Sequence, residues 1–266
     1  MGESGCRTQV ADDQRSAPGF RYVRATVEYD GTDYCGFQWQ AGQPTVQGEL
    51  ERALAVATQE EIRITAAGRT DTGVHARGQV IAFHTRWRHS LEELERALNA
   101  LLAEDVAVRD LTPAEEGFHP RFSASSREYR YTILNQWVRS PLARRFAYHW
   151  PQPLNVEVMQ QATQELVGTH DFATFGQPPQ GENTVRQVLR ATWSREGPFI
   201  YFDIEANAFL QRMVRSIVGT LLQVGSGALS PQDFVQILHA ADRSLAGPVA
   251  PPHGLCLMRV NYVRET

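Results

Sequence analysis

Two kinds of hydrophobic repeat follow one another along this 266-residue chain, and their order constrains the fold more than any short motif does. Alternation of apolar and polar residues predicts a strand, whereas apolar residues spaced three and four apart predict a helix. The first half of the chain gives the order strand, helix, strand, strand, helix, strand, which is the split pattern of a ferredoxin-like unit. The six segments are residues 21–30, 45–58, 61–65, 79–85, 90–102 and 105–111.

The second half repeats this order without obvious sequence similarity to the first. A hairpin at Glu196, Gly197 and Pro198 is expected to join its two middle strands. Ser230 and Pro231 are typical first residues of a further helix. We therefore expect an α+β fold in which two ferredoxin-like βαββαβ units lie side by side, with loops that converge on a cleft. The segments are residues 126–134, 156–168, 184–195, 199–207, 209–225, 230–241 and 254–263.

The boundary between the two units is expected near residues 112–120, which contain proline and glycine. This division gives an N-terminal α+β domain over residues 21–115, which carries the acidic loop described below, and a C-terminal α+β domain over residues 116–266. Residues 1–20 are polar and contain no apolar run, so we expect a flexible tail rather than a signal peptide. The sequence contains no run of about 18 apolar residues, so we expect no membrane span.

The basic residues are unusual because all 26 are arginine and the chain contains no lysine. Schiff-base lysines and phosphate-loop lysines are therefore excluded. The net charge is −4, yet residues 62–88 hold five arginines against one acid, and residues 121–145 hold six against one. Arginine binds phosphate through two hydrogen bonds and stacks on bases, so both stretches suit a polyanionic partner. The alternative, two solvated faces balanced by acidic helices, stays open on charge alone.

Cysteine usage and missing catalytic signatures narrow the function classes. Cys6, Cys35 and Cys256 lie far apart and do not form a metal-binding spacing. This usage indicates a reducing compartment, most simply the cytoplasm. The G-x-S-x-G pattern of serine hydrolases, the H-E-x-x-H pattern of zinc proteases and the Walker loop are all absent from the sequence.

The segment AAGRTDTGVHARGQV, residues 66–80, places a single acid, Asp71, between Arg69 and His75. On the pattern alone, the favoured interpretation of Asp71 is a turn residue that bonds its own backbone. A metal site shared with His75 is discounted, because Gly73 argues against a helix and no third ligand lies nearby. The remaining interpretation is a carboxylate positioned in a polyanion-binding cleft, which suits nucleophilic or general-base catalysis.

Two tyrosines mark the strand predicted at residues 126–134. Tyr129 and Tyr131 lie on one face of this strand. Strand tyrosines commonly pack on a core, but an aromatic ring among six arginines also suits base stacking. The residues alone leave both interpretations open.

Seven stretches, taken together, resemble the tRNA pseudouridine synthase A family. They occur in order from about residue 21 to residue 262, and the stretch GRTDTGVHA is highly specific to that family. The seven stretches are YDGTDYCGFQWQ, TVQGELERAL, GRTDTGVHARGQV, FHPRFSASSREYRY, GTHDFATF, ANAFLQRMVRSIVGTLLQVGSG and APPHGLCLMRVNY.

The resemblance implies a pseudouridine-synthase-type mixed sheet with helices and a central cleft. It also implies isomerisation of uridine to pseudouridine at positions 38, 39 and 40 of the tRNA anticodon arm, without a cofactor or a metal. The family's catalytic aspartate falls on Asp71, and its base-stacking tyrosine falls on Tyr129. The arginine that helps to extrude the target base falls on Arg69, and the arginine that pairs with the aspartate falls on Arg215. The expected partners are tRNA and a second copy of the chain, because the family acts as a homodimer with tRNA spanning both subunits.

Arg215 also stands out on the helix predicted at residues 209–225. A helical wheel places it at the margin of the apolar stripe, whereas Arg212 points outward. Its side chain either extends along the edge with its head in water or reaches the cleft and binds Asp71. Two competing protein classes remain: a non-catalytic RNA-binding module, and a metal-dependent hydrolase that uses Asp71 and His75.

Overall fold

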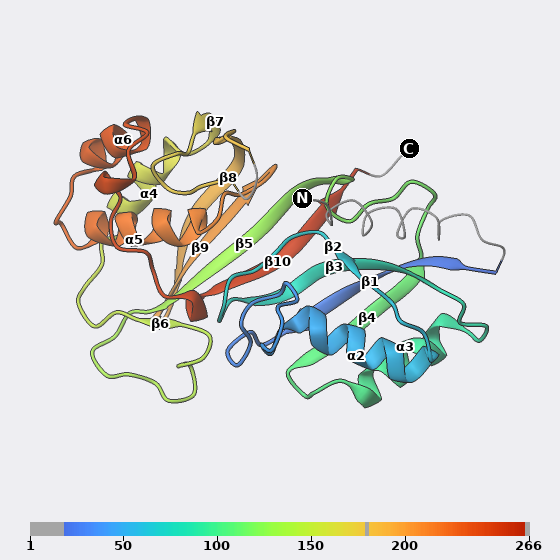
Figure 1. The fold of residues 1–266 in the computed structure, drawn as a ribbon. Helices are drawn as coiled ribbons and strands as arrows, with labels where there is room; N and C mark the ends of the chain where they lie inside the picture. The colour runs from blue at the N-terminus through green and yellow to red at the C-terminus, as the bar shows by residue number, and fades with distance from the viewer. Residues whose placement is uncertain (1–18, 179–180, 264–266) are drawn as a thin grey trace.

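The computed structural model describes residues 19–178 and 181–263, and these residues build one continuous mixed sheet (Figure 1). The predicted tail, residues 1–20, lies outside the described residues up to position 18. The sheet order is β4-β1-β3-β10-β5-β9-β8-β7, with β2 paired to β3 and β6 paired to β5. The strands are β1 (Arg21–Tyr29), β2 (Thr65–Ala66), β3 (His75–Thr85), β4 (Val106–Pro113), β5 (Ala124–Leu134), β6 (Tyr148–His149), β7 (Gly168–Asp171), β8 (Val185–Glu196), β9 (Phe199–Ala206) and β10 (Leu255–Tyr262).

Strand order and direction show two ferredoxin-like units, which confirms the predicted α+β architecture. In the first unit β1 lies between β4 and β3 and is antiparallel to both. In the second unit β5 lies between β10 and β9 in the same antiparallel manner, and β8 follows β9. β10 runs parallel to β3 over only two residue pairs, Cys256 with His75 and Leu257 with Ala76. This short seam joins the two units.

The α-helices of the described residues gather at opposite ends of the sheet, with α2 and α3 over the first unit and α4, α5 and α6 over the second (Figure 1). Their first residues follow from local capping, because the side chains of Thr45, Ser90 and Ser230 each accept a backbone N–H of the first turn. Ser90 also forms a capping box with Glu93. The helices are α2 (Val46–Thr58), α3 (Leu91–Leu101), α4 (Val156–Gln164), α5 (Met213–Gly225) and α6 (Pro231–His239).

Each unit encloses its own hydrophobic core. Leu50, Leu94 and Val108 belong to the core of the first unit, and Phe202 and Ile217 belong to that of the second. The ring of a partly buried tyrosine on β5, at position 129, packs against both cores. The predicted boundary at residues 115 and 116 falls between the end of β4 and the start of β5. Independent folding of the two domains stays a prediction.

Two of the predicted limits of strands and helices are wrong. Of the strand predicted at residues 61–65, only Thr65 is extended and paired, because the backbone N–H of Ile64 donates to the Glu51 carboxylate at 3.2 Å rather than to a strand. The helix predicted from residue 209 begins at Met213, since Arg212 has a φ of 63°, in the left-handed region. Residues 209–211 therefore form a loop.

Three further differences are smaller. β3 begins at residue 75, four residues before the predicted start, and so includes His75. The helix predicted to residue 168 ends at Gln164, and Gly168 begins β7. The short strands β6 and β7 are too brief to show a period in the sequence, and neither was predicted.

Candidate active site

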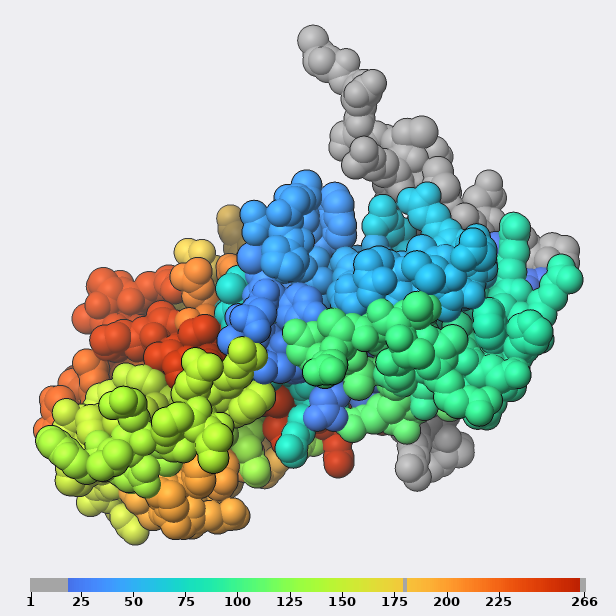
Figure 2. Space-filling model, turned by 90° about the horizontal axis from the view of Figure 1, so that it is seen from below, coloured from blue at the N-terminus to red at the C-terminus, as the bar shows by residue number. Residues whose placement is uncertain are grey.

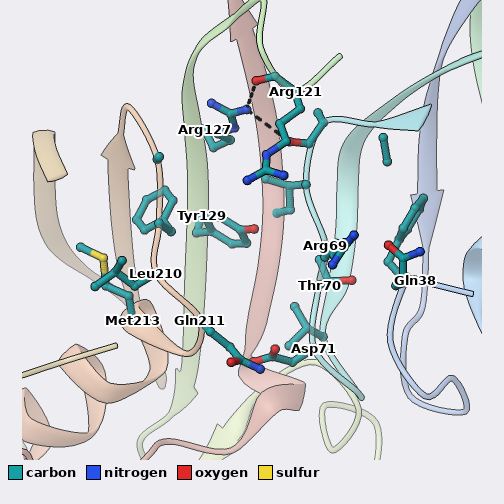
Figure 3. A pocket seen from close by; sticks show the side chains of 18 of the residues that line it. Gln38, Arg69, Thr70, Asp71, Arg121, Arg127, Tyr129, Leu210, Gln211 and Met213 are labelled. Carbon is teal, nitrogen blue, oxygen red and sulfur yellow. Dashed lines mark hydrogen bonds between the residues drawn. The ribbon is translucent and has the colours of Figure 1, made fainter. Parts of the chain in front are cut away.

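A cleft of about 700 Å³ opens between the two units and receives residues from both (Figure 3). Among the described residues that line it, Asp71 is the only acid. Five arginines share the same lining, so the cleft is strongly positive apart from this one carboxylate. The arginines are Arg69, Arg121, Arg127, Arg186 and Arg212.

Asp71 lies in the loop between β2 and β3 and is bound by a residue from the other unit. Nη1 of Arg215, in the first turn of α5, donates to Oδ2 of Asp71 at 3.2 Å. Nε of Arg215 donates to the carbonyl oxygen of Ala250 at 2.8 Å, which fixes the plane of the guanidinium. The Arg215 side chain is 14% exposed and that of Asp71 is 28% exposed. The guanidinium of Arg215 therefore binds Asp71, which lines the cleft, rather than extending into water.

The loop that carries Asp71 is held by close backbone packing against residues 30–37. A Cβ atom at Gly31 would lie 2.1 Å from the carbonyl oxygen of Val74, and one at Gly36 would lie 2.8 Å from that of Thr70. Only glycine permits both approaches. The Thr70 hydroxyl shares a 2.7 Å hydrogen bond with the hydroxyl of Tyr29. These contacts fix the backbone on both sides of the carboxylate.

His75 anchors the far end of this loop. Its Nε2 lies 2.8 Å from the carbonyl oxygen of Arg145 and 3.2 Å from that of His253, so this nitrogen carries the hydrogen and donates. Its Nδ1 accepts the N–H of Gly31 at 3.1 Å and also lies 3.1 Å from Oδ1 of Asp30. Because both ring nitrogens are used, His75 has no lone pair left for a metal. Within the described residues no group of three His, Cys, Asp or Glu side chains could hold a metal ion, and Asp71 with His75 does not form one.

Tyr129 and Arg69 both face the cleft, from opposite sides (Figure 3). The ring of Tyr129, on β5, meets Phe209 edge to face, with ring centroids 5.0 Å apart. Burial raises the pKa of the Tyr129 phenol well above its ordinary value, so this side chain stays neutral. Arg69 is exposed, and in residues 19–178 and 181–263 no carboxylate pairs with it. Tyr131, by contrast, is fully buried in the core and donates to Pro251.

Arg127 is a residue of the cleft wall that the sequence alone does not single out. Its guanidinium donates to the carbonyl oxygens of Asn207 at 2.8 Å, Ala67 at 3.2 Å, Arg121 at 2.5 Å and Ala124 at 3.4 Å. Burial lowers its pKa, since desolvation disfavours the charged form. Arg127 thereby ties three segments of the cleft wall together without using a carboxylate. The only signal in the sequence was its place two residues before Tyr129 in an arginine-rich stretch.

Comparisons with known proteins agree on one family. A family described as tRNA pseudouridine synthase matches residues 25–123 and 162–263. The protein tRNA pseudouridine synthase A of Moorella thermoacetica is 47% identical over 245 residues, which are 90% of this chain and 99% of that protein. The protein of the same name from Roseiflexus castenholzii is 46% identical over 92% of each chain.

Among solved structures, the chain is similar to one described as an H/ACA RNP bound to a substrate RNA containing 2'-deoxyuridine. The identity is 13% and the TM-score is 0.36, over 75% of this chain and 44% of that chain. None of the described helices combines the length and the apolar character needed to cross a membrane.

Proposed function

This chain belongs to the tRNA pseudouridine synthase family, isomerases that convert uridine to pseudouridine, and we propose that it acts at positions 38, 39 and 40 of the anticodon arm with Asp71 as the catalytic group. The observation that carries the proposal is the pairing of Asp71 with Arg215 inside an arginine-lined cleft that has no other acid among its described lining residues. The anticodon-arm positions rest on the family resemblance of residues 68–80 and the six other stretches.

The chemistry of the reaction fits a single carboxylate. Isomerisation breaks the bond from N1 of uracil to C1′ of the ribose, turns the base, and forms a bond from C5 to C1′. The proton on C5 leaves and N1 gains one, so the step is neither a redox reaction nor a hydrolysis. Oδ2 of Asp71 accepts the hydrogen bond from Arg215, while within the described residues Oδ1 accepts none. Oδ1 is the atom available to attack the base or the ribose, or to take a proton.

Binding requires the target uridine to leave its stack, at a cost of a few kcal/mol. Arg69 is exposed beside Asp71 and can occupy the vacated space in the RNA. Tyr129 offers a neutral ring for the extruded base, and stacking of this kind contributes about 1–3 kcal/mol per base. Arg121, Arg186 and Arg212 line the same cleft and suit the phosphates on either side.

We also propose that the protein is a homodimer, that tRNA spans both subunits, and that it works in the cytoplasm, as the resemblance and the cysteine usage imply. An exposed apolar segment supports the dimer. Residues 135–147, between β5 and β6, expose Trp137, Val138 and Leu142, the last at 95%. Figure 2 shows the yellow-green part of the chain, which includes this loop, on the outer surface. Analytical ultracentrifugation should give the dimer mass, and Leu142→Asp should shift it toward the monomer.

The deciding experiment is an activity assay without added metal. Purified protein is incubated with uridine-containing tRNA, the RNA is digested, and pseudouridine is quantified by mass spectrometry and mapped by reverse transcription after carbodiimide labelling. Pseudouridine at positions 38–40 supports the proposal, and pseudouridine elsewhere removes the assigned positions. A protein that binds tRNA but forms no pseudouridine would instead be the non-catalytic RNA-binding module.

A further inference from the structure

An aromatic ring lies at the mouth of the cleft with no packing role that accounts for it. Phe122 lines the cleft and is nevertheless 76% exposed. An exposed ring of this size forgoes the stabilisation that burial would give it. Single exposed apolar residues are common on surfaces, but this one is fixed in place and lies beside the candidate active site.

The turn that carries Phe122 is built around His119. The carbonyl oxygen of His119 accepts the N–H of Ser123 at 2.9 Å, and the hydroxyl of Ser123 accepts the N–H of His119 at 3.0 Å. Nδ1 of His119 accepts the N–H groups of Arg121 at 3.1 Å and of Phe122 at 3.3 Å. The imidazole also contacts the Phe122 ring, with centroids 4.3 Å apart and planes tilted by 36°. The orientation of Phe122 is therefore set by the protein before any ligand binds.

This turn is also fastened to the strand that carries Tyr129. The guanidinium of Arg127, two residues before Tyr129 on β5, donates to the carbonyl oxygen of Arg121 (Figure 3). The guanidinium of Arg121 lies 5.5 Å from the centroid of the Phe122 ring, which places a positive charge beside the aromatic surface. An aromatic ring flanked by a cation is the arrangement that binds an unpaired nucleotide.

We propose that Phe122 is a stacking platform for an unpaired base of the RNA next to the target uridine. This assignment rests on the proposed function and adds a second nucleotide subsite beyond Tyr129. Extrusion of the target base removes a stacking partner from its neighbour in the strand. Phe122 takes the place of that partner, and Arg121 binds the phosphate that joins the two nucleotides. The subsite recognises a base by its flat face, so it tolerates different bases at the flanking position.

The test is a double-mutant cycle between the side chain and the RNA. Affinities of wild type, Phe122→Ala and Phe122→Trp are measured by fluorescence anisotropy on anticodon-arm RNAs in which each nucleotide flanking the target is made abasic in turn. On intact RNA, Phe122→Ala should bind about 5- to 150-fold more weakly than wild type, the range expected for one stacked base. Phe122→Trp should bind like wild type. Phe199→Ala, which removes an aromatic ring at the far end of β9 outside the cleft lining, should change nothing.

The abasic series separates stacking from a general effect on the turn. For wild type, one flanking abasic position should reproduce the loss caused by Phe122→Ala, and at that position the variant should lose nothing more. If Phe122→Ala lost the same additional affinity at every abasic position, the stacking proposal would be wrong. It would also be wrong if Phe122→Ala bound intact RNA as tightly as wild type. Pseudouridine formation by wild type is measured in parallel. If wild type forms none, the proposed function fails; if it forms pseudouridine and the cycle shows no coupling, only the stacking subsite fails.

Discussion

Arg215 and Asp71 form an ion pair, with Nη1 and Oδ2 3.2 Å apart, between residues that are 144 positions apart in the chain. Arg215 lies in the first turn of a helix of the second unit, and Asp71 lies in a loop of the first. The ion pair therefore forms only when the two units are correctly positioned against each other. It also orients one carboxylate oxygen and leaves the other facing the cleft.

Arg215→Lys should fold normally and bind tRNA within a few-fold of wild type, yet lose most of its catalytic rate. Lysine keeps the charge and the aliphatic stem but lacks the planar fork, so it does not satisfy Asp71 and the Ala250 carbonyl together. Single-turnover rates, thermal unfolding and tRNA affinity check this, with Arg243→Lys as a control on the surface. Wild-type turnover by Arg215→Lys would show that the pairing has no catalytic role.

Asp71→Asn should keep the fold and nearly all of the tRNA affinity but abolish isomerisation. The amide preserves the shape of the side chain and removes its nucleophilic and basic character. Asp110→Asn, outside the cleft lining, is the matched control and should retain full activity. Activity of Asp71→Asn within about tenfold of wild type, ~1.4 kcal/mol of barrier, is incompatible with a catalytic Asp71.

Tyr129→Ala should slow single turnover strongly, because it removes the ring on which the extruded base stacks, a contribution of about 1–3 kcal/mol. Tyr129→Phe should retain most of the rate, since within the described residues the Tyr129 hydroxyl makes no hydrogen bond. Thermal unfolding of both variants separates this effect from lost packing on Phe209. A normal single-turnover rate for Tyr129→Ala would return the residue to a packing role.

Affinity for tRNA should fall steeply as salt increases, despite the net charge of −4. The arginines that line the cleft displace counterions from the RNA, and the slope of log affinity against log salt reports their number. Arg186→Gln should reduce the magnitude of that slope by about 1. A slope near zero for wild type would contradict binding of a polyanion in the cleft.

The thiol of Cys256 should resist alkylation by iodoacetamide at pH 8, whereas Cys35 should react. Burial raises the pKa of the Cys256 thiol to about 11, so below that pH the reactive thiolate is scarce in the folded state. Cys256 lies on β10 where that strand meets β3, so its alkylation rate measures how often the seam opens. Peptide mass spectrometry resolves the two sites. Equal rates at both would mean that the seam is open to solvent at pH 8.

The sequence predicts the order of elements well, because each long strand and helix carries its own period. It fails where a side chain or a single dihedral angle overrides that period. The Glu51 carboxylate accepts the N–H of Ile64, so the predicted strand does not form there. Arg212 has a left-handed backbone conformation, so α5 begins only at Met213. Neither effect is visible in hydrophobic spacing.

The residues of the site likewise fall into those that the sequence predicts and those that it does not. Asp71 and its flanking arginine are recognisable from a local segment, whereas their partners depend on contacts between distant parts of the chain. Nothing in the sequence indicates that Arg127 binds four carbonyl groups, or that both nitrogens of His75 are used to hold the loop. These roles require the strands of the second unit to lie beside those of the first.

The two-pair seam between β3 and β10 has a consequence for folding. Strand pairs within the first unit join residues up to 90 positions apart, as Val23 with Pro113. The bond from His75 to the carbonyl of His253 spans 178 positions. Pairings so distant in sequence close large loops and form slowly. We therefore expect the cleft to assemble after the two units and to open before them under mild denaturant. Hydrogen exchange should show amides at the seam opening at lower denaturant than amides in α3 or β1, with tRNA affinity lost while most secondary structure persists.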